Sequence, residues 1–374
     1  MKVAVGISGG VDSAVAALLI REQGHEVIGV TMTLGRANEA QSLAEAKAAA
    51  ERLEIPLEVF NFSAAWDSQV LQYLRNVYLG GQTPNPCVRC NEMVKFGLLP
   101  QAAFALGCER FATGHYARIA LDDGVKLLRA VDRAKDQSYF LYRVRPEILA
   151  RTIFPLGELT KTEVREKARA YGLEVADKGD SQDFCGGDPM KVVGAAPREG
   201  NIVTADGKVL GRHQGFWNYT IGKRKGLGIG GGTPYYVIGL NAARNEVIVG
   251  FRESVVVHQF KVDRVVFLTS GKDSASPFAS ETNVFPHKVT ENGEAESFPL
   301  VRNGLRRPLS VKVRSAGEPH SPVAFDGETV HCPDGITGVA PGQSAVFYCG
   351  DEVVGGGVIA SRTEGGANLE SNLI

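Results

Sequence analysis

The sequence is poor in cysteine and in long apolar runs. Six cysteines are scattered over 374 residues, at positions 87, 90, 108, 185, 332 and 349, which excludes a scaffold held together by disulfides. No stretch reaches the roughly 18 consecutive apolar residues of a membrane helix, and the first residues, MKVAVGISGG, meet glycine before a signal-peptide core can form. These absences predict a soluble, cytoplasmic protein with no membrane partner.

The sequence also lacks a net charge of either sign. Its 41 basic and 42 acidic residues give a formal net charge of −1, which excludes a protein that coats nucleic acid indiscriminately, and we expect no DNA partner. Two stretches nevertheless contain basic residues and no Asp or Glu, residues 207–245 and 299–317. Each is either a footprint for a phosphate backbone or a solvated loop balanced by acidic residues elsewhere, and charge alone does not separate the two.

Short β-branched runs alternate with helical patterns through the first half of the chain. The first run, residues 2–7, precedes a helical pattern at 11–20, and a later run, RFATGHYA at 110–117, is predicted as a strand. This alternation predicts a parallel sheet with helices on both faces. A further helix is predicted from Lys161 to Tyr171, with Thr160 as its N-cap.

A change of pattern divides the chain. After about residue 195 the helical patterns give way to short alternating runs punctuated by glycine, which are typical of hairpins. The same style continues from about residue 251 and predicts a second β-rich module, a small barrel. The length itself favours two or three domains. We therefore expect an α/β catalytic domain over residues 1–194, a β-rich central domain over 195–250 and a C-terminal β-barrel over 251–374.

The string SGGVDS, residues 8–13, stands between the first predicted strand and the first predicted helix. Its two glycines let backbone amides approach a pyrophosphate, its two serines add hydroxyl donors, and the helix N-terminus adds positive partial charge. The string has neither the lysine of the GxxxxGK[ST] loop nor the spacing of GxGxxG, which points away from γ-phosphate hydrolysis and from NAD. The sequence therefore predicts a cradle for an anion here.

Two thiols stand three residues apart in NPCVRCN, residues 85–91. Cys87 and Cys90 look like half of a zinc site, but the chain has no second CxxC and no HxxxH, so no metal site is predicted. One candidate partner remains, Cys185, in a polar loop after the predicted helix at 161–171. Loop thiols near cationic groups acquire the thiolate character that a nucleophile requires.

A first strand followed by SGGVDS resembles the signature of the PP-loop ATP pyrophosphatases, which cleave ATP between its α and β phosphates and leave AMP on a substrate oxygen. Seven further strings extend the resemblance nearly from end to end, and in this order they are similar to the bacterial tRNA-specific 2-thiouridylase family. They are NPCVRCNEMVKF, TGHYAR, KDQSYFL, PLGELTKTEVREKA, KGDSQDFC, YTIGKRKGLGIGG and VAPGQSAVFYCGDEVVGGGVI.

The resemblance implies a fold, a reaction and partners. The fold is a parallel-sheet PP-loop domain of the adenine nucleotide alpha hydrolase type, a small β-rich central domain and a C-terminal β-barrel. The reaction is ATP-dependent 2-thiolation of the wobble uridine of tRNA: the uridine O2 is adenylated, and a persulfide on Cys185 then delivers sulfur. Cys90 is the second catalytic cysteine. ATP with Mg²⁺, tRNA and a persulfide donor or relay protein are the implied cofactor and partners.

The resemblance also implies roles for individual residues. It implies that the residues in contact with ATP are Gly6, Ile7, Ser8, Gly9, Gly10, Val11, Asp12, Ser13, Met32 and Gly114. It implies that the residues in contact with tRNA are Asn85, Pro86, Cys87, His115, Lys135, Asp136, Gln137, Arg314, Ser315 and Gln343. The first three of these would line the target base.

Three other interpretations stay open. An iron-sulfur cluster held by Cys87, Cys90 and Cys185 would carry the same reaction by another route, although the persulfide route is favoured. A PP-loop ligase acting on a small molecule would need neither Cys90 nor Cys185. A tRNA-binding protein without catalysis would consume no ATP.

Overall fold

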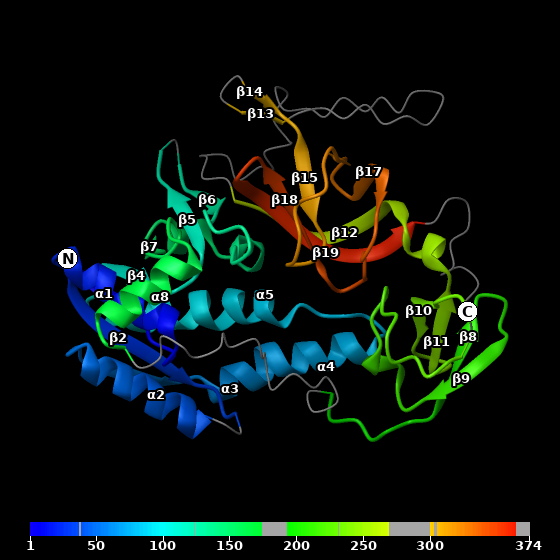
Figure 1. Cartoon of the computed structure of the whole chain (residues 1–374), viewed down its shortest axis with the longest axis horizontal. Helices are drawn as coiled ribbons and strands as arrows, with labels where there is room; N and C mark the ends of the chain where they lie inside the picture. The colour runs from blue at the N-terminus through cyan, green and yellow to red at the C-terminus, as the bar shows by residue number, and fades with distance from the viewer. Residues whose placement is uncertain are drawn as a thin grey trace.

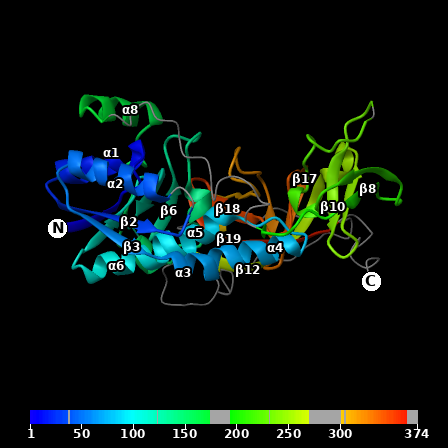
Figure 2. The ribbon, with the colours of Figure 1, turned by 90° about the horizontal axis from the view of Figure 1, so that it is seen from below.

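The computed structural model describes residues 1–36, 39–122, 124–173, 193–230, 232–268, 300–302 and 305–363. Figure 1 shows an α/β region at the N-terminal end, a small β region at the opposite end and a β-barrel between and above them. In the view turned by 90° (Figure 2), the molecule is elongated and the barrel strands lie between the other two regions. Cys185, predicted to carry a persulfide, lies outside the described residues.

Five parallel strands form the sheet of the α/β region, in the order β3-β2-β1-β4-β7. Their bounds are β1 Lys2–Gly6, β2 Glu26–Thr33, β3 Leu57–Asn61, β4 Arg110–Ala112 and β7 Thr152–Ile153. The central strand β1 is apolar from Val3 to Val5 because both of its faces are covered. The parallel sheet predicted from the alternation is confirmed.

Helices cover both faces of this sheet. On the face of Val3 and Val5 lie α1 Val11–Glu22, α2 Glu39–Arg52 and α8 Lys161–Ala170. On the face of Ala4 lie α6 Leu99–Ala105 and α7 Pro146–Leu149. Helix α8 begins where the sequence predicts, because Thr160 and Glu163 form a capping box: the Glu163 carboxylate accepts from Thr160 N at 2.7 Å.

Two long helices run together beneath the barrel (Figure 1). The first consists of α3 Ser63–Trp66, the π-helical segment η1 Asp67–Leu71 and α4 Gln72–Leu79. The second consists of α5 Pro86–Cys90, the π-helical segment η2 Asn91–Leu98 and α6. Their facing side chains, among them Trp66, Leu74 and Val94, form an apolar cluster of their own. Single π-helical turns are frequently found at functional sites, so both helices are candidates for a functional role.

The central β region is a four-stranded sheet in the order β10-β11-β8-β9. Its elements are β8 Gly200–Thr204, β9 Val209–His213, the 3-10 helix η5 Phe216–Asn218, β10 Tyr236–Asn241 and β11 Glu246–Gly250. Phe216, Trp217 and Val247 lie in its core. The hairpins predicted after residue 195 are confirmed.

The C-terminal β region closes into a barrel, as predicted. Its strands are β12 Val257–Phe267, β15 Leu309–Lys312, β16 Ala324–Phe325, β17 Thr329–Ile336, β18 Ser344–Cys349 and β19 Glu352–Thr363. They follow the order β15-β18-β19-β12-β17-β16, and an isolated bridge joins Val311 of β15 to His320, which precedes β16 in the chain. The 3-10 helix η6 Arg252–Val255 precedes the barrel, and β13 Leu300–Arg302 pairs with β14 Leu305–Arg307 beside it.

A hairpin of the α/β region joins the barrel sheet, which the sequence did not predict. Strands β5 Ala117–Ala120 and β6 Lys126–Arg129 pair with each other, and Leu127 of β6 pairs with Val353 of β19. The single strand predicted over residues 110–117 is therefore wrong in part: β4 ends at Ala112 and β5 begins a new sheet. The break occurs where Gly114 passes so close to α1 that a Cβ atom there would lie 2.7 Å from the Asp12 carbonyl carbon.

Within the described ranges, no helix combines the length and the apolar character that crossing a bilayer requires.

Candidate active site

The phosphate loop, residues 6–13, joins the end of β1 to the start of α1. Ser13 Oγ donates to the Gly10 carbonyl at 2.9 Å and accepts from Ser8 N at 3.2 Å, so one hydroxyl closes the loop. Gly10 is the N-cap of α1 and has no side chain with which to cap the first amides of the helix. Those amides and the helix dipole are therefore left to an anion.

Two glycines allow the close packing around this loop. Gly9 has φ +79°, a conformation that side chains rarely adopt, and a Cβ atom there would lie 2.5 Å from Glu45 Cβ. Gly114, which follows β4, approaches the backbone of Asp12 too closely for any side chain. Packing around the loop therefore requires glycine at both positions, and the first amides of α1 with the hydroxyls of Ser8 and Ser13 are donors suited to the phosphates of a nucleotide.

The remaining predicted nucleotide contacts lie on the same edge of the sheet. Ile7 and Val11 are buried and anchor the loop in the core. Met32, near the end of β2, is half-buried. The ends of β1, β2 and β4 thus converge where parallel α/β sheets bind their ligands.

Sequence reasoning missed Lys161, the first residue of α8. Its side chain is buried, and its Nζ donates to the two carboxylate oxygens of Asp12 at 2.7 and 2.8 Å. The Tyr116 hydroxyl donates to Asp12 as well, at 2.9 Å. The phosphate loop has no lysine of its own, and α8 supplies one from 149 positions along the chain. The only signal in the sequence was a lysine directly after a predicted N-cap.

The two predicted thiols belong to helix α5. Asn85 is its N-cap, with Oδ1 accepting from Val88 N at 3.2 Å, and Pro86 stands at the first position, where a missing N–H costs nothing. Cys87 is half-buried. Cys90 ends the helix inside the apolar cluster of the two long helices and is only 3% exposed.

Burial raises the pKa of both thiols above the ordinary cysteine value, and the positive charges of Lys95 and Arg36 oppose this effect. At neutral pH both groups are therefore thiols in this conformation, and a catalytic step at Cys90 requires a change that strengthens its contact with a cation or with water. Lys95 stands in η2, the π-helical segment that begins directly after Cys90. It is a second residue that sequence reasoning missed.

Replacing Lys95 by methionine is expected to raise the pKa of Cys87 further, because a stabilising positive charge is lost while the burial stays. The pH profile of Cys87 alkylation by iodoacetamide, followed by mass spectrometry, should shift to higher pH. Lys47→Met, which removes an exposed lysine from α2, is the matched control and should leave the profile in place. An unshifted profile in Lys95→Met would show that Lys95 does not act on the thiol.

His115 connects the thiol helix to the phosphate loop. Its ring lies 5.4 Å from the ring of Phe96 in η2, and its Nδ1 lies 2.8 Å from Thr113 Oγ1. Burial, together with the nearby charge of Lys95, lowers the pKa of His115 to about 3. The imidazole is therefore neutral at physiological pH, and it cannot neutralise a phosphate. The same lysine thus acts on both thiols and on the residue after Gly114.

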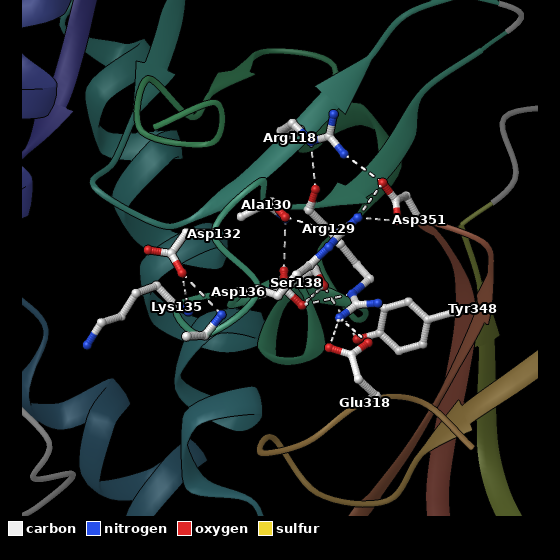
Figure 3. Close-up of polar contacts among 12 residues, drawn as sticks. Arg118, Arg129, Ala130, Asp132, Lys135, Asp136, Ser138, Glu318, Tyr348 and Asp351 are labelled. Carbon is white, nitrogen blue, oxygen red and sulfur yellow. Dashed lines mark hydrogen bonds and ion pairs between the residues drawn. The ribbon is translucent and has the colours of Figure 1, made fainter. Parts of the chain in front are cut away.

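Lys135, Asp136 and Gln137 lie in the loop between β6 and the 3-10 helix η3 Ser138–Leu141. Their side chains have different surroundings. Asp136 is turned into the protein, whereas Lys135 is half-buried and points away from the barrel (Figure 3). Gln137 Oε1 accepts from Tyr116 N at 2.9 Å.

The barrel contributes three predicted tRNA contacts, and one of them reaches α5. Gln343 Nε2 donates to the carbonyls of Thr83 and Pro84 at 3.2 and 2.8 Å, directly before Asn85. Arg314 and Ser315 are exposed beyond the end of β15. The structure therefore brings Gln343 to the segment predicted to hold the target base.

A cavity of about 60 Å³ lies between α5 and the barrel, and neither cysteine of α5 lines it. Its polar lining includes Asn85, Arg89, Glu92, Arg143 and Ser344. Glu92 forms ion pairs with Arg89 at 3.1 Å and with Arg143 at 2.9 Å, and Arg264 also lines the cavity, so its lining has an excess of positive charge.

Comparisons with known proteins cover nearly the whole chain. Three family models match it, described as the tRNA methyl transferase HUP domain at residues 1–186, the tRNA methyl transferase PRC-barrel domain at 192–251 and the aminomethyltransferase beta-barrel domain at 301–359. The tRNA-specific 2-thiouridylase MnmA of Nostoc punctiforme is 39% identical over 96% of this chain and 98% of its own. The MnmA of Endomicrobium trichonymphae is 41% identical over 96% and 99%.

This chain belongs to the tRNA-specific 2-thiouridylase family. Membership confirms the resemblance carried by the motifs, and the order of the matched models confirms the predicted fold class of an α/β domain, a small β domain and a β-barrel. The family models and the curated relatives carry different names, methyl transferase and 2-thiouridylase, which imply different group transfers. Among the described residues of this thiouridylase, no group of three or more His, Cys, Asp or Glu side chains is arranged to hold a metal ion.

Proposed function

We propose that this protein transfers sulfur to the 2-position of uridine in tRNA, at the wobble position of the anticodon, after activating the uridine oxygen with ATP. The observation that supports it most is the adjacency of the two halves of the site. The ring of Phe96, in the segment that directly follows Cys90, lies 5.4 Å from the ring of His115, and His115 directly follows the glycine packed on the phosphate loop. The positive charge of Lys95, in the same segment, is near both thiols and His115.

The first step is activation of the base. A wobble uridine has to leave its stack before its C2 carbonyl can be reached. Its O2 then attacks the α-phosphorus of ATP, the bond to the β-phosphate breaks, and pyrophosphate leaves with the negative charge. The amides of the phosphate loop and the ammonium of Lys161 are the groups that receive this charge. Mg²⁺ would be expected with ATP, and Asp12 would hold it only in exchange for Lys161, from which both of its oxygens accept.

The second step is sulfur transfer. The terminal sulfur of a persulfide on Cys185 attacks C2, AMP leaves with the former O2, and the base is joined to Cys185 through a disulfide. The thiolate of Cys90 then attacks the Cys185 sulfur, which releases the 2-thiouridine and forms a Cys90-Cys185 disulfide. An external dithiol reduces that disulfide, and a persulfide donor or relay protein reloads Cys185.

The three regions have separate tasks in this reaction. Residues 1–194 form the catalytic domain, residues 195–250 a central tRNA-binding domain and residues 251–374 the C-terminal barrel. The target base lies against Asn85, Pro86 and Cys87. The proposed tRNA contacts elsewhere are His115, Lys135, Gln137, Arg314, Ser315 and Gln343. The contact predicted at Asp136 rests on the sequence alone, because its carboxylate is buried. The reaction takes place in the cytoplasm, where the tRNA is found.

Mass spectrometry of tRNA nucleosides tests the proposal. An unmodified tRNA transcript is incubated with the protein, ATP and a persulfide donor, and we expect 2-thiouridine together with one AMP and one pyrophosphate for each sulfur transferred. Omitting ATP or the donor should abolish the product. A methylated nucleoside would instead support the group transfer that the family-model descriptions name.

The same assay distinguishes persulfide-based thiolation from three competing functions. ATP cleavage that needs a small molecule and no tRNA would indicate a PP-loop ligase. tRNA binding without ATP cleavage would indicate a binding protein. Thiolation that requires iron, and is lost in Cys87→Ala, would indicate a cluster held by Cys87, Cys90 and Cys185.

A further inference from the structure

Asp136 lies at the centre of a hydrogen-bonded loop, residues 132–138, and its carboxylate is fully enclosed, with a side-chain exposure of 0%. Oδ1 accepts from Ala130 N at 3.0 Å and from Ser138 N at 3.2 Å, and Oδ2 accepts from Ser138 Oγ at 3.0 Å. Arg129 Nε lies 3.5 Å from Oδ2. A carboxylate with these partners has no surface to offer to RNA, and its charge would repel a phosphate.

Arg129 connects the 132–138 loop to the barrel by hydrogen bonds. Its Nη2 donates to both carboxylate oxygens of Glu318 at 3.0 and 2.8 Å, and its backbone N donates to the Asp351 carbonyl at 2.9 Å. Figure 3 shows the Arg129 guanidinium between Asp136, Glu318 and the ring of Tyr348. The Tyr348 hydroxyl also lies 3.4 Å from Ser138 Oγ.

Two further arginines reinforce the connection. Arg118 donates to Asp351 at 2.9 Å, and Arg133 donates to both oxygens of the same carboxylate at 2.7 and 2.8 Å. With the pairing of β6 and β19, these contacts make the hairpin of residues 117–129 and the barrel one connected sheet. The barrel residues predicted to meet tRNA are therefore held in a fixed relation to the loop.

The other side of the loop is bonded to the phosphate site. Gln137 N donates to the Tyr116 carbonyl at 2.8 Å and Gln137 Oε1 accepts from Tyr116 N, while the Tyr116 hydroxyl reaches Asp12. Asp132 Oδ2 accepts from Lys161 N at 3.0 Å, and the side chain of the same lysine holds Asp12. Two routes of hydrogen bonds thus connect the loop to one carboxylate of the phosphate loop.

We propose that Asp136 is a positioning residue: its buried carboxylate holds the 132–138 loop between the barrel and the phosphate loop, so that binding of tRNA and binding of ATP strengthen each other. The inference rests on the proposed function, since it assumes that both ligands bind. The sequence predicts that Asp136 contacts tRNA. In this inference Asp136 instead supports the loop that contacts RNA and does not touch RNA itself. Lys135, whose side chain points away from this cluster, is left as the direct contact of the loop (Figure 3).

Coupling between the two ligands is the quantity to measure. The affinity for α,β-methylene-ATP, which cannot be cleaved at the reacting bond, is determined by calorimetry with and without saturating tRNA transcript. In the wild type we expect tRNA to tighten the binding of the analogue by about 5-fold or more, and the analogue to tighten the binding of tRNA by the same factor. In Asp136→Asn the factor should fall to about one, with the affinity for tRNA alone little changed, because an amide nitrogen in place of Oδ2 cannot accept from the Ser138 hydroxyl and brings no charge to face Arg129.

Matched variants distinguish a positioning role of Asp136 from a direct contact with tRNA and from a general loss of structure. Asp122→Asn alters an exposed carboxylate of the same hairpin, paired with Lys126 at 2.9 Å, and should keep the wild-type coupling. Lys135→Ala should weaken tRNA binding and leave the affinity for the analogue alone unchanged. If Asp136→Asn does not fold, Tyr116→Phe removes only the hydroxyl that reaches Asp12 and should reduce the coupling in the same way.

The outcomes are distinguishable. Coupling retained in Asp136→Asn, with weaker binding of tRNA alone, would overturn the inference and make Asp136 a direct contact. A wild type that binds both ligands without any coupling would overturn it as well, and would leave the proposed function standing. A wild type that binds neither the analogue nor tRNA would remove the proposed function itself.

Discussion

Cys90→Ser is expected to reduce thiolation on the order of 10³-fold or more, the scale on which enzymes lose activity when a nucleophile is removed. A serine hydroxyl cannot attack a sulfur atom under these conditions, so the product should stay attached to Cys185 and the enzyme should stop after a partial turnover. The measurement is 2-thiouridine released per enzyme, together with AMP formed in the first turnover. AMP release should survive the substitution, because adenylation and the first sulfur attack do not use Cys90.

Cys108→Ser is the matched control. Cys108 is also buried, at 2% exposure, but it lies in the turn between α6 and β4 and away from the phosphate loop, so its replacement should leave the rate essentially unchanged. Cys87→Ala separates the persulfide route from an iron-sulfur cluster, since only the cluster needs this thiol. Full turnover by Cys90→Ser would contradict the assignment of Cys90, whatever the result for Cys87.

Because Cys90 is buried, the proposed mechanism requires its thiol to become accessible. The thiol lies between two helices whose contact includes Trp66 and Val94, and burial keeps its pKa above the ordinary value. Attack on a disulfide therefore has to follow a local opening of α5 against its neighbour. The π-helical segments η1 and η2 lie at this contact, and π turns are frequent at functional sites.

Local patterns explain why much of the fold was predictable. Thr160 and Glu163 are three residues apart, so the start of α8 is decided by contacts that the sequence displays directly. The phosphate loop is equally local, because strand, glycines and helix are consecutive. The parallel sheet followed from apolar runs that are buried on both faces.

Contacts between distant parts of the chain explain what was missed. Lys161 and Asp12 are 149 positions apart, and Gln343 and Thr83 are 260 apart, so no local pattern reveals that either pair meets. The motif NPCVRCN identified the thiols, but the burial of Cys90 depends on Trp66 and Leu74 of another helix. The addition of β6 to the barrel depends on the pairing of Leu127 with Val353, which composition cannot specify.

Lys161→Met is expected to lower kcat/KM for ATP by about 10²- to 10³-fold, the cost usually measured when one preorganised group that receives developing charge is removed. The lysine is the only cation that the structure places on Asp12 in an ion pair within the described residues, at 2.7 Å. Without it, the Asp12 carboxylate would face the phosphates of ATP uncompensated, and the departing pyrophosphate would lose a cation.

A matched variant and a double-mutant cycle test whether the effect on kcat/KM is specific to Lys161 and its ion pair with Asp12. Lys167→Met removes the same charge from the same helix, two turns away, and should change kcat/KM little. Asp12→Asn combined with Lys161→Met should be less than additive, because each single change leaves the partner of a close ion pair exposed to the substrate. Pyrophosphate release, followed with a coupled assay over a range of ATP concentrations, separates an effect on binding from one on the chemical step. If Lys161→Met raised KM alone and left kcat intact, Lys161 would bind the ground state of ATP and would take no part in stabilising the leaving pyrophosphate.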